Sequence, residues 1–391
     1  MNIQSLRAET PGCKTKIHFN NAGSSLPPSA VLNAMTEYLT LEAQMGGYET
    51  ADLKAAEGNG FYKSMAALLN CSAENIAFTS SATSSFSRAL SCIPFKAGDY
   101  ILIANEDYIS NQLVFLSLQK RFGIRLLRAN SLPEGGTDID DMKRLMDQFH
   151  PTLVSISHTQ TNSGLIQPAE EIGKLCRERS ITYLVDACQS VGQLPVDVKK
   201  IQCDFLTGTF RKFVRGPRGA GFLFVSDRVL KTSMEPLFID MRGADWKEKD
   251  SYTLRADARR FEEWELPYAL VAGSKTAVDY SLSIGLEEIQ KRNKYLCDIV
   301  RKQITDTGLT LLDKGKHLSS IITVKIPGKE SHDVLQSLRN KNINTSITYR
   351  GSAVIDFDAK GVIWALRISP HYYNTEEEIG LLVQALKELS A

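Results

Sequence analysis

The sequence predicts an α/β protein built around a mainly parallel β-sheet. Short apolar runs rich in β-branched and aromatic residues alternate with amphipathic helical patterns through the middle of the chain, as in successive strand–helix units. The runs at residues 153–156 and 183–185 are almost continuously apolar, which is typical of strands covered on both faces. A chain of 391 residues with 43% hydrophobic content can bury a large core, and its length favours two domains.

The first part of the chain supplies this sheet, and we predict a large domain over residues 18–255. Helical patterns at residues 138–149 and 168–178 lie between the apolar runs. The runs that we expect to form strands are residues 75–79, 100–104, 153–157, 181–185, 204–208 and 219–225.

The pattern changes after about residue 255, and we predict a smaller α+β domain over residues 256–391 that also takes the N-terminal arm, residues 1–17. Its closing helix is well marked, because Thr375 and Glu378 form a capping box ahead of apolar residues at helical spacing. The other elements expected here are a long helical region over residues 266–305, a helix over 331–340, and strands over 320–326, 344–349 and 364–369.

Composition narrows the function. Lys plus Arg total 46 against 45 for Asp plus Glu, a net charge of +1, which argues against a dedicated nucleic-acid binder or a membrane-surface protein. The first residues have no apolar leader, and no run of 18 apolar residues occurs, so a cytoplasmic enzyme is expected. The seven cysteines are scattered and the six histidines lack ligand spacing; reduced thiols are expected and a metal is not.

Polar clusters follow the predicted strands. Residues 80–83 follow the first strand, 106–108 the second and 158–164 the third, while Asp186 ends the fourth and residues 209–212 follow the fifth. Ligands of open α/β sheets bind beyond the carboxyl ends of strands, so these clusters predict one shared crevice.

Lys212 and Asp186 carry the strongest chemical signal. Asp186 ends an apolar strand, and Lys212 follows in a turn rich in Gly and Thr, after Thr209 and Arg211 and before Gly216. An enzyme that holds pyridoxal phosphate needs a lysine for the Schiff base and a carboxylate that keeps the pyridine nitrogen protonated. The neighbouring Arg211 would also lower the pKa of Lys212 by like-charge repulsion.

Each of these residues also has an ordinary interpretation. A lone lysine is most often a solvated surface residue, and a strand-end aspartate is most often a helix cap or a loop ion pair. The hydroxyl-rich residues 80–85 suit a phosphate site at a helix N-terminus but are equally an ordinary cap. The glycine-rich residues 216–221 lead into a strand rather than a helix, so a dinucleotide site is not expected there.

Taken together, the motifs resemble those of the class V aminotransferase family of fold-type I pyridoxal-phosphate enzymes. That family includes cysteine desulfurases, selenocysteine lyases, kynureninases and isopenicillin-N epimerase-like proteins. The likeness runs from residues 18–23 to residues 367–375 and is most specific over residues 186–221. It implies a mainly parallel seven-stranded sheet between helices, a smaller C-terminal domain and pyridoxal 5'-phosphate as cofactor.

The resemblance also implies roles for individual residues. Lys212 would carry the cofactor, Asp186 would pair with the pyridine nitrogen, and Arg367 would hold the substrate carboxylate, for which a bidentate guanidinium is suited. Asn162 would lie near the ring oxygen and the substrate, and Asn21 would join the substrate site. The remaining cofactor-binding residues would be Ser81, Ala82 and Thr83 with Thr209 and Arg211 around the phosphate, Tyr108 on the ring and Gln189 at the phenolic oxygen.

The chain departs from the family pattern at three places. Arg211 stands where members usually have histidine before the lysine. Residues 348–356, where desulfurases carry a nucleophilic cysteine, contain none, and no cysteine occurs from residue 298 onward. Residues 259–265 resemble the segment that reaches the neighbouring subunit's phosphate but lack its Gly-Thr-Pro, which leaves Trp264 as a candidate replacement in a homodimer.

A persulfide-forming desulfurase is therefore not expected. We expect an enzyme that acts on an amino acid as its small-molecule substrate, with C–S lysis of a cysteine derivative without a catalytic cysteine ahead of transamination or epimerisation. All three reactions begin with loss of the Cα proton. A protein that binds the cofactor without turnover is a further alternative. Arg242 and Arg350 are candidates for the distal end of the substrate.

Overall fold

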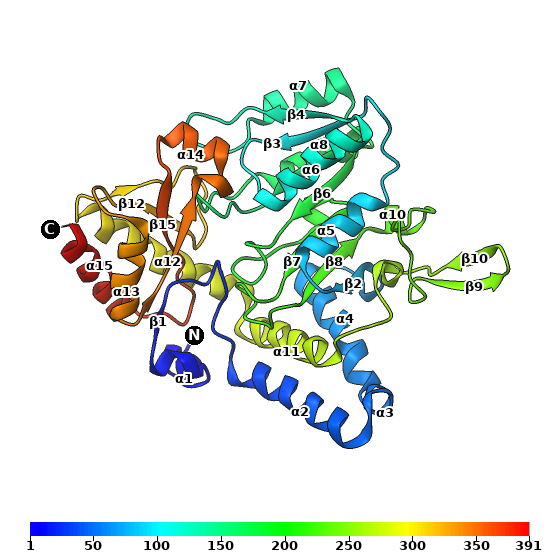
Figure 1. Cartoon of the computed structure of the whole chain (residues 1–391), viewed down its shortest axis with the longest axis horizontal. Helices are drawn as coiled ribbons and strands as arrows, with labels where there is room; N and C mark the ends of the chain where they lie inside the picture. Colours follow the sequence, from blue (N-terminus) through cyan, green and yellow to red (C-terminus); the bar gives the residue numbers. More distant parts are fainter. Residues whose placement is uncertain (391) are drawn as a thin grey trace.

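A computed structural model describes residues 1–390 of the protein, and a seven-stranded sheet forms its centre (Figure 1). The strand order is β2-β8-β7-β6-β5-β3-β4. All of these strands run in one direction except β8, which is antiparallel to both of its neighbours. The predicted, mainly parallel sheet is therefore confirmed. The strands are β2 (Ile76–Thr79), β3 (Tyr100–Ala104), β4 (Arg125–Ala129), β5 (Leu153–Ser157), β6 (Thr182–Asp186), β7 (Phe205–Thr209) and β8 (Gly221–Val225).

Helices cover both faces of this sheet, because its side chains alternate between two cores. Along β3, Ile101 and Ile103 pack in the core beneath α5 and α6, whereas Leu102 and Ala104 belong to the larger core beneath α4, α7, α8 and α11. The helices are α2 (Ser29–Met45), α3 (Gly47–Leu53), α4 (Ala55–Leu69), α5 (Ala82–Ser91), α6 (Ile109–Phe122), α7 (Ile139–Phe149), α8 (Ala169–Glu178), α9 (Val198–Ile201), α10 (Asp227–Leu230) and α11 (Tyr268–Ile284).

A second core lies in the C-terminal part of the chain. It is formed by a four-stranded antiparallel sheet, β11-β12-β15-β14, and by the helices on it. The predicted capping box is present, since Glu378 N donates to Thr375 Oγ1 at 3.2 Å and Thr375 N donates to Glu378 Oε2 at 3.1 Å. The elements are α12 (Leu286–Thr305), β11 (Thr310–Leu311), β12 (Ile322–Lys325), α13 (Ser331–Asn340), β13 (Ile343–Asn344), β14 (Ser346–Tyr349), α14 (Val354–Lys360), β15 (Trp364–Ile368) and α15 (Glu376–Ser390).

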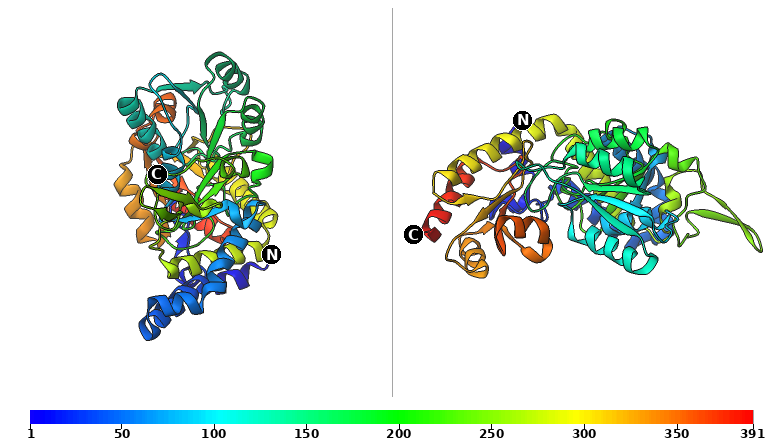
Figure 2. Two further views of the ribbon diagram at one scale, coloured as in Figure 1. Left: turned by 90° about the vertical axis from the view of Figure 1, so that its right-hand side faces the viewer. Right: turned by 90° about the horizontal axis from the view of Figure 1, so that it is seen from above.

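Several elements differ from the prediction or were not predicted. The helical region expected over residues 266–305 is two helices, because Gly285 between α11 and α12 has φ of +92°, a conformation that ends a helix. The unpredicted β4 is an edge strand with arginines among its few apolar residues. The hairpin of β9 (Ala244–Glu248) and β10 (Ser251–Leu254) projects from the body of the molecule (Figure 2).

The chain passes from the first core to the second at a point C-terminal to residue 255, near which we predicted the domain boundary. Helix α11 contributes Val271 and Val278 to the large core, while α12 contributes Leu296 and Val300 to the second core, so packing changes at the α11–α12 junction. The N-terminal arm joins the second part, because β1 (Ile17–His18) pairs with β13, and α1 (Ile3–Ala8) lies nearby (Figure 1). No helix within residues 1–390 is both long and apolar enough to cross a bilayer.

Candidate active site

The polar clusters that follow the strands meet at one edge of the sheet. Strands β2, β3, β5, β6 and β7 run in the same direction, so their carboxyl ends lie on the same side. The convergence predicted from the sequence is thus observed, and it places the turn after β7 beside the end of β6. That edge is where open α/β sheets bind ligands.

Lys212 lies inside the protein rather than on its surface. Only 6% of the residue is exposed, and within residues 1–390 its amine makes no hydrogen bond or ion pair. Nζ lies 5.7 Å from the centre of the Tyr108 ring. Burial lowers the pKa of Lys212, and Arg211 and Arg367 add to the lowering against the opposing effect of Asp186. The surface-lysine interpretation is wrong for this residue, because its side chain is buried.

Asp186 is held by two donors at the end of β6. Its Oδ1 accepts from Cys188 N at 2.9 Å and its Oδ2 accepts from Asn111 Nδ2 at 3.0 Å. Asn111 also donates to Asp107 Oδ1 at 3.1 Å, so it joins two buried carboxylates. Sequence reasoning gave Asn111 no role. Its place in the first turn of α6, four residues after Asp107, is the signal that could have identified it.

Ser81 begins the helix that was proposed as a phosphate site. Its hydroxyl caps α5 by accepting from Ser84 N at 3.1 Å, and Ala82 and Thr83 form the first turn. A Cβ at Gly221 would lie 2.5 Å from the Ser81 carbonyl carbon, so only glycine lets β8 approach this turn so closely. Thr209 Oγ1 donates to Ala220 O at 3.3 Å, next to that contact.

Two arginines add positive charge without a carboxylate partner among the described residues. Arg211 Nη1 donates to the carbonyl of Gly23, and Arg367 Nε donates to Ser346 Oγ at 3.1 Å. Burial, with the neighbouring Arg211, lowers the pKa of Arg367 to about 10. Such crowding of Lys212, Arg211 and Arg367 fits a site that receives anions.

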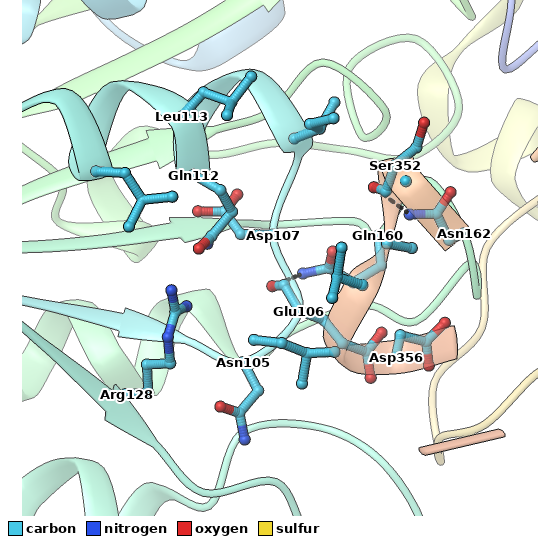
Figure 3. A pocket seen from close by; sticks show the side chains of 16 residues that line it. Asn105, Glu106, Asp107, Gln112, Leu113, Arg128, Gln160, Asn162, Ser352 and Asp356 are labelled. Atoms are coloured by element: carbon cyan, nitrogen blue, oxygen red, sulfur yellow. Dashed lines mark hydrogen bonds between the residues drawn. The ribbon is translucent and has the colours of Figure 1, made fainter. Parts of the chain in front are cut away.

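The predicted amides have different surroundings. Asn162 links the two parts of the molecule, accepting from Thr348 Oγ1 at 2.5 Å and donating to Ser352 O at 3.3 Å (Figure 3). Gln189 donates to Ala22 O and Thr161 Oγ1, both at 3.2 Å, while its buried Oε1 has no partner among the described residues.

Asn21 is engaged by the protein itself. It donates to the carbonyls of His18 and Ser369 and accepts from Tyr373 OH at 2.5 Å. These contacts tie the N-terminal arm to the segment after β15, which is a structural use of the side chain.

Three further residues lie apart from this cluster or are engaged elsewhere. Trp264, after the 3₁₀ turn η3 (Ala258–Phe261), is 46% exposed, and its backbone N donates to Asp240 Oδ1 at 2.7 Å. Arg242 pairs with Glu262 at 3.0 Å and Arg350 Nη2 donates to Asp358 at 2.7 Å. Because carboxylates already occupy both arginines, neither is free for the distal end of a substrate.

Comparison with known proteins agrees with this arrangement. The family model for aminotransferase class-V matches residues 17–382. A probable cysteine desulfurase of Methanothermobacter thermautotrophicus is 28% identical, over 100% of this chain and 98% of the relative. Isopenicillin N epimerase of Streptomyces clavuligerus is 26% identical, over 84% and 83%.

A solved structure extends the likeness to three dimensions. The apo cysteine desulfurase from Thermococcus onnurineus NA1 superposes with a TM-score of 0.92 at 25% identity, over 100% of this chain and 98% of that one. The matched family model spans both parts of the molecule and every cluster at the sheet edge. The chain therefore belongs to the class-V aminotransferase family.

Proposed function

We propose that the protein is a pyridoxal 5'-phosphate enzyme that cleaves the Cβ–S bond of a cysteine derivative without a cysteine nucleophile. The observation that carries the proposal is the buried, unpartnered amine of Lys212 beside Asp186 and Arg367. A structural lysine at such depth would need hydrogen-bond acceptors, whereas a lysine that forms a covalent link to an aldehyde must keep its amine free.

The residues at the sheet edge fit this cofactor. The N-terminus of α5, with Ser81, Ala82 and Thr83, and the nearby Thr209 and Arg211 would hold the phosphate. Asp186, fixed by Asn111 and Cys188 N, would hold the ring nitrogen. The Tyr108 ring would lie against the cofactor ring, and Gln189, whose Oε1 has no partner among the described residues, would lie near the phenolic oxygen. When bound, the cofactor supplies an electron sink for the substrate Cα.

Arg367 and Lys212 have separate roles in the proposed reaction. Arg367 binds the substrate carboxylate and orients the amino acid. Within the described part of the chain its Nε donates to Ser346 and its Nη atoms make no hydrogen bond. Lys212 Nζ accepts the Cα proton, because its lowered pKa favours the neutral amine. The Cβ–S bond breaks as sulfur leaves with the electron pair and takes up a proton. In balance, the derivative and one water give a thiol, pyruvate and ammonium.

The loop over residues 350–356 supports lysis over desulfuration. Its Ser352 carbonyl accepts from Asn162, at the edge of the site, and the loop carries no cysteine. Cys188 is the cysteine that lies near Lys212, but burial and Asp186 raise the pKa of its thiol well above the usual range. A thiol held in its neutral form is a poor nucleophile.

We further propose a homodimer whose active sites lie near the subunit interface, and a cytoplasmic location. Large apolar side chains are exposed on and near the hairpin, with Phe238 82% and Trp246 81% exposed. Trp264 belongs to the same part of the chain. Patches of this kind mark protein contacts.

Purified protein with cofactor tests the proposal. We expect a visible absorbance band that borohydride abolishes, and pyruvate from S-methylcysteine. New amino acid from alanine plus an oxo acid would instead indicate a transaminase, racemised substrate an epimerase, and a band without turnover a binding protein. A protein that shows no band with added cofactor would contradict the assignment of Lys212.

A further inference from the structure

A cavity of about 300 Å³ opens beside the candidate site, between α6 and the loop that precedes α14 (Figure 3). Small-molecule sites start at about this volume. The cavity shares Asp107 and Asn162 with the site, and Asp107 precedes Tyr108, whose ring faces Lys212. A substrate bound at the lysine can therefore extend into the cavity with its side chain.

The walls of the cavity are largely apolar. Ile109, Leu113 and Leu116 line one side from α6, and Val354 and Ile355 line the other from α14. Leu113 is 59% exposed and Val354 is 45% exposed. A ligand in the cavity would therefore bury apolar surface of both side chains. These walls favour an aliphatic group of a few carbons.

One end of the cavity holds three buried polar atoms without partners. Among the described residues, Asp107 Oδ2, Gln112 Nε2 and Arg128 Nη1 make no hydrogen bond. Figure 3 shows these three side chains on one side of the cavity, opposite Asn162 and Ser352. Unpaired polar atoms at such depth are costly, so a ligand group that pairs with them would be strongly selected.

The two oxygens of Asp107 differ sharply. Oδ1 accepts from Tyr108 N at 2.7 Å, from Asn111 Nδ2 at 3.1 Å and from the hydroxyl of Ser157. Oδ2 accepts no hydrogen bond from any residue of the range 1–390. The three atoms that lack partners are therefore one acceptor, on Asp107, and two donors, on Gln112 and Arg128.

A carboxamide is the group that completes all three. Its oxygen accepts from Gln112 and Arg128, and its N–H donates to Asp107 Oδ2. Above pH 7, where Asp107 is ionised, a carboxylate would use the two donors but would place a second negative charge against Asp107. An alkyl end would leave all three atoms unpaired.

We propose that this cavity binds the substituent on the substrate sulfur and prefers a short aliphatic chain that ends in a carboxamide. The inference rests on the proposed C–S lyase function and names its substrate class. Gln112, Leu113 and Arg128 are then specificity residues, and none of them belongs to the lysine cluster.

Four cysteine derivatives test it, and each is titrated against the cofactor band of the holoenzyme to give a Kd. They are S-(2-carbamoylethyl)-, S-(2-carboxyethyl)-, S-(3-methylbutyl)- and S-methylcysteine; the first three are matched in size. We expect the carbamoyl compound to bind about tenfold more tightly than the other two long compounds. Equal Kd values for these three would overturn the inference.

Two variants locate the preference. Gln112→Leu should reduce the carbamoyl advantage, and Leu113→Trp should weaken all three long compounds about tenfold by filling the cavity, with S-methylcysteine within twofold. Leu381→Trp, at an exposed position of α15, is the matched control. If Leu113→Trp changes all four compounds alike, or none, the cavity is not the substituent site.

The same titration separates this inference from the proposed function. S-methylcysteine that perturbs the band and yields pyruvate in the unmodified protein upholds the lyase, whatever the long compounds do. S-methylcysteine that neither binds nor reacts overturns the lyase, and the substituent site with it.

Discussion

Lys212 and Arg215 are two buried cations three residues apart in the same turn, and the protein treats them in opposite ways. Arg215 donates to Leu26 O at 2.8 Å, to Tyr372 OH at 2.6 Å and to Thr10 Oγ1 at 2.6 Å. Its guanidinium also lies 4.4 Å from the centre of the Tyr373 ring. Among the described residues, the Lys212 amine contacts the face of Tyr108 and makes no hydrogen bond.

The pKa values of Arg215 and Lys212 shift in opposite directions, as their different contacts predict. The pKa of Arg215 is raised, because the surrounding tyrosines outweigh the effect of burial, whereas burial lowers the pKa of Lys212. A satisfied cation stabilises the fold, while an unsatisfied one is available for chemistry. The difference separates a structural residue from a catalytic one within a single turn.

The largest expected effect is at Lys212. Lys212→Ala should abolish the borohydride-sensitive band and all pyruvate formation, because no other amine stands at the site. The measurement is a spectrum and a turnover assay of the purified variant. Circular dichroism should be unchanged, and turnover that survives the substitution would remove Lys212 from the chemistry.

Arg215 should show the reverse behaviour. Arg215→Met leaves three buried acceptors unpaired and should lower the free energy of unfolding by about 3–5 kcal/mol, measured by urea denaturation of the apoprotein. Lys212→Met is the matched control and should leave the apoprotein equally or more stable, since an unpartnered buried amine is lost. Equal destabilisation by the two substitutions would erase the distinction between the two cations.

Arg367 is a third basic residue without a carboxylate partner among the described residues. It extends the comparison of Lys212 with Arg215 to the binding of the substrate carboxylate. Arg367→Ala should raise KM about 100-fold through loss of a charge-assisted contact, with the cofactor band retained. Steady-state kinetics on S-methylcysteine provide the measurement, and Arg350→Ala, on an exposed ion pair, is the control. An unchanged KM would exclude Arg367 from the carboxylate site.

The smallest effect is expected at Asp107. One of its carboxylate oxygens is hydrogen-bonded and the other is not, which repeats within one side chain the contrast between Arg215 and Lys212. Burial raises the pKa of Asp107 to about 7. The folded state then binds a proton that the unfolded state has released, so this group's stabilising contribution is lost as the pH rises toward and through 7. From pH 5.5 to 8 the loss is about 2 kcal/mol.

Asp107→Asn should flatten this part of the pH profile of stability, measured by urea denaturation of the apoprotein at both pH values. Asp358→Asn, on the exposed surface, should leave the profile as it is. A profile that keeps its slope in Asp107→Asn would show that another group titrates there.

Much of the fold could be predicted because local pattern and packing agree. Strands such as β5 and β6 are mostly apolar and almost entirely buried, since both faces are covered, and the closing helix carries its own cap. The edge strand β4 lacked that signal. The break at Gly285 was missed because a single glycine inside a helical pattern does not by itself predict a change of helix direction.

The candidate site was predictable where one residue type has few alternatives. Lys212 and Asp186 stood out by spacing, whereas Asn111, Gln112 and Arg128 did not, since their importance depends on which partners they lack or share in three dimensions. Asn21 shows the converse limit. Its position in a family motif suggested a ligand contact, yet its hydrogen bonds are taken by the N-terminal arm and the segment after β15.

The single reversed strand, β8, has a consequence for the cofactor. It lies between β2, which leads into α5, and β7, which leads into the lysine turn. Two interstrand spacings of about 4.8 Å each therefore separate the helix turn that would hold the phosphate from the turn that carries Lys212. The sheet thus acts as a spacer of fixed width, and an insertion that displaced β8 would mismatch the phosphate grip and the amine even with every side chain intact.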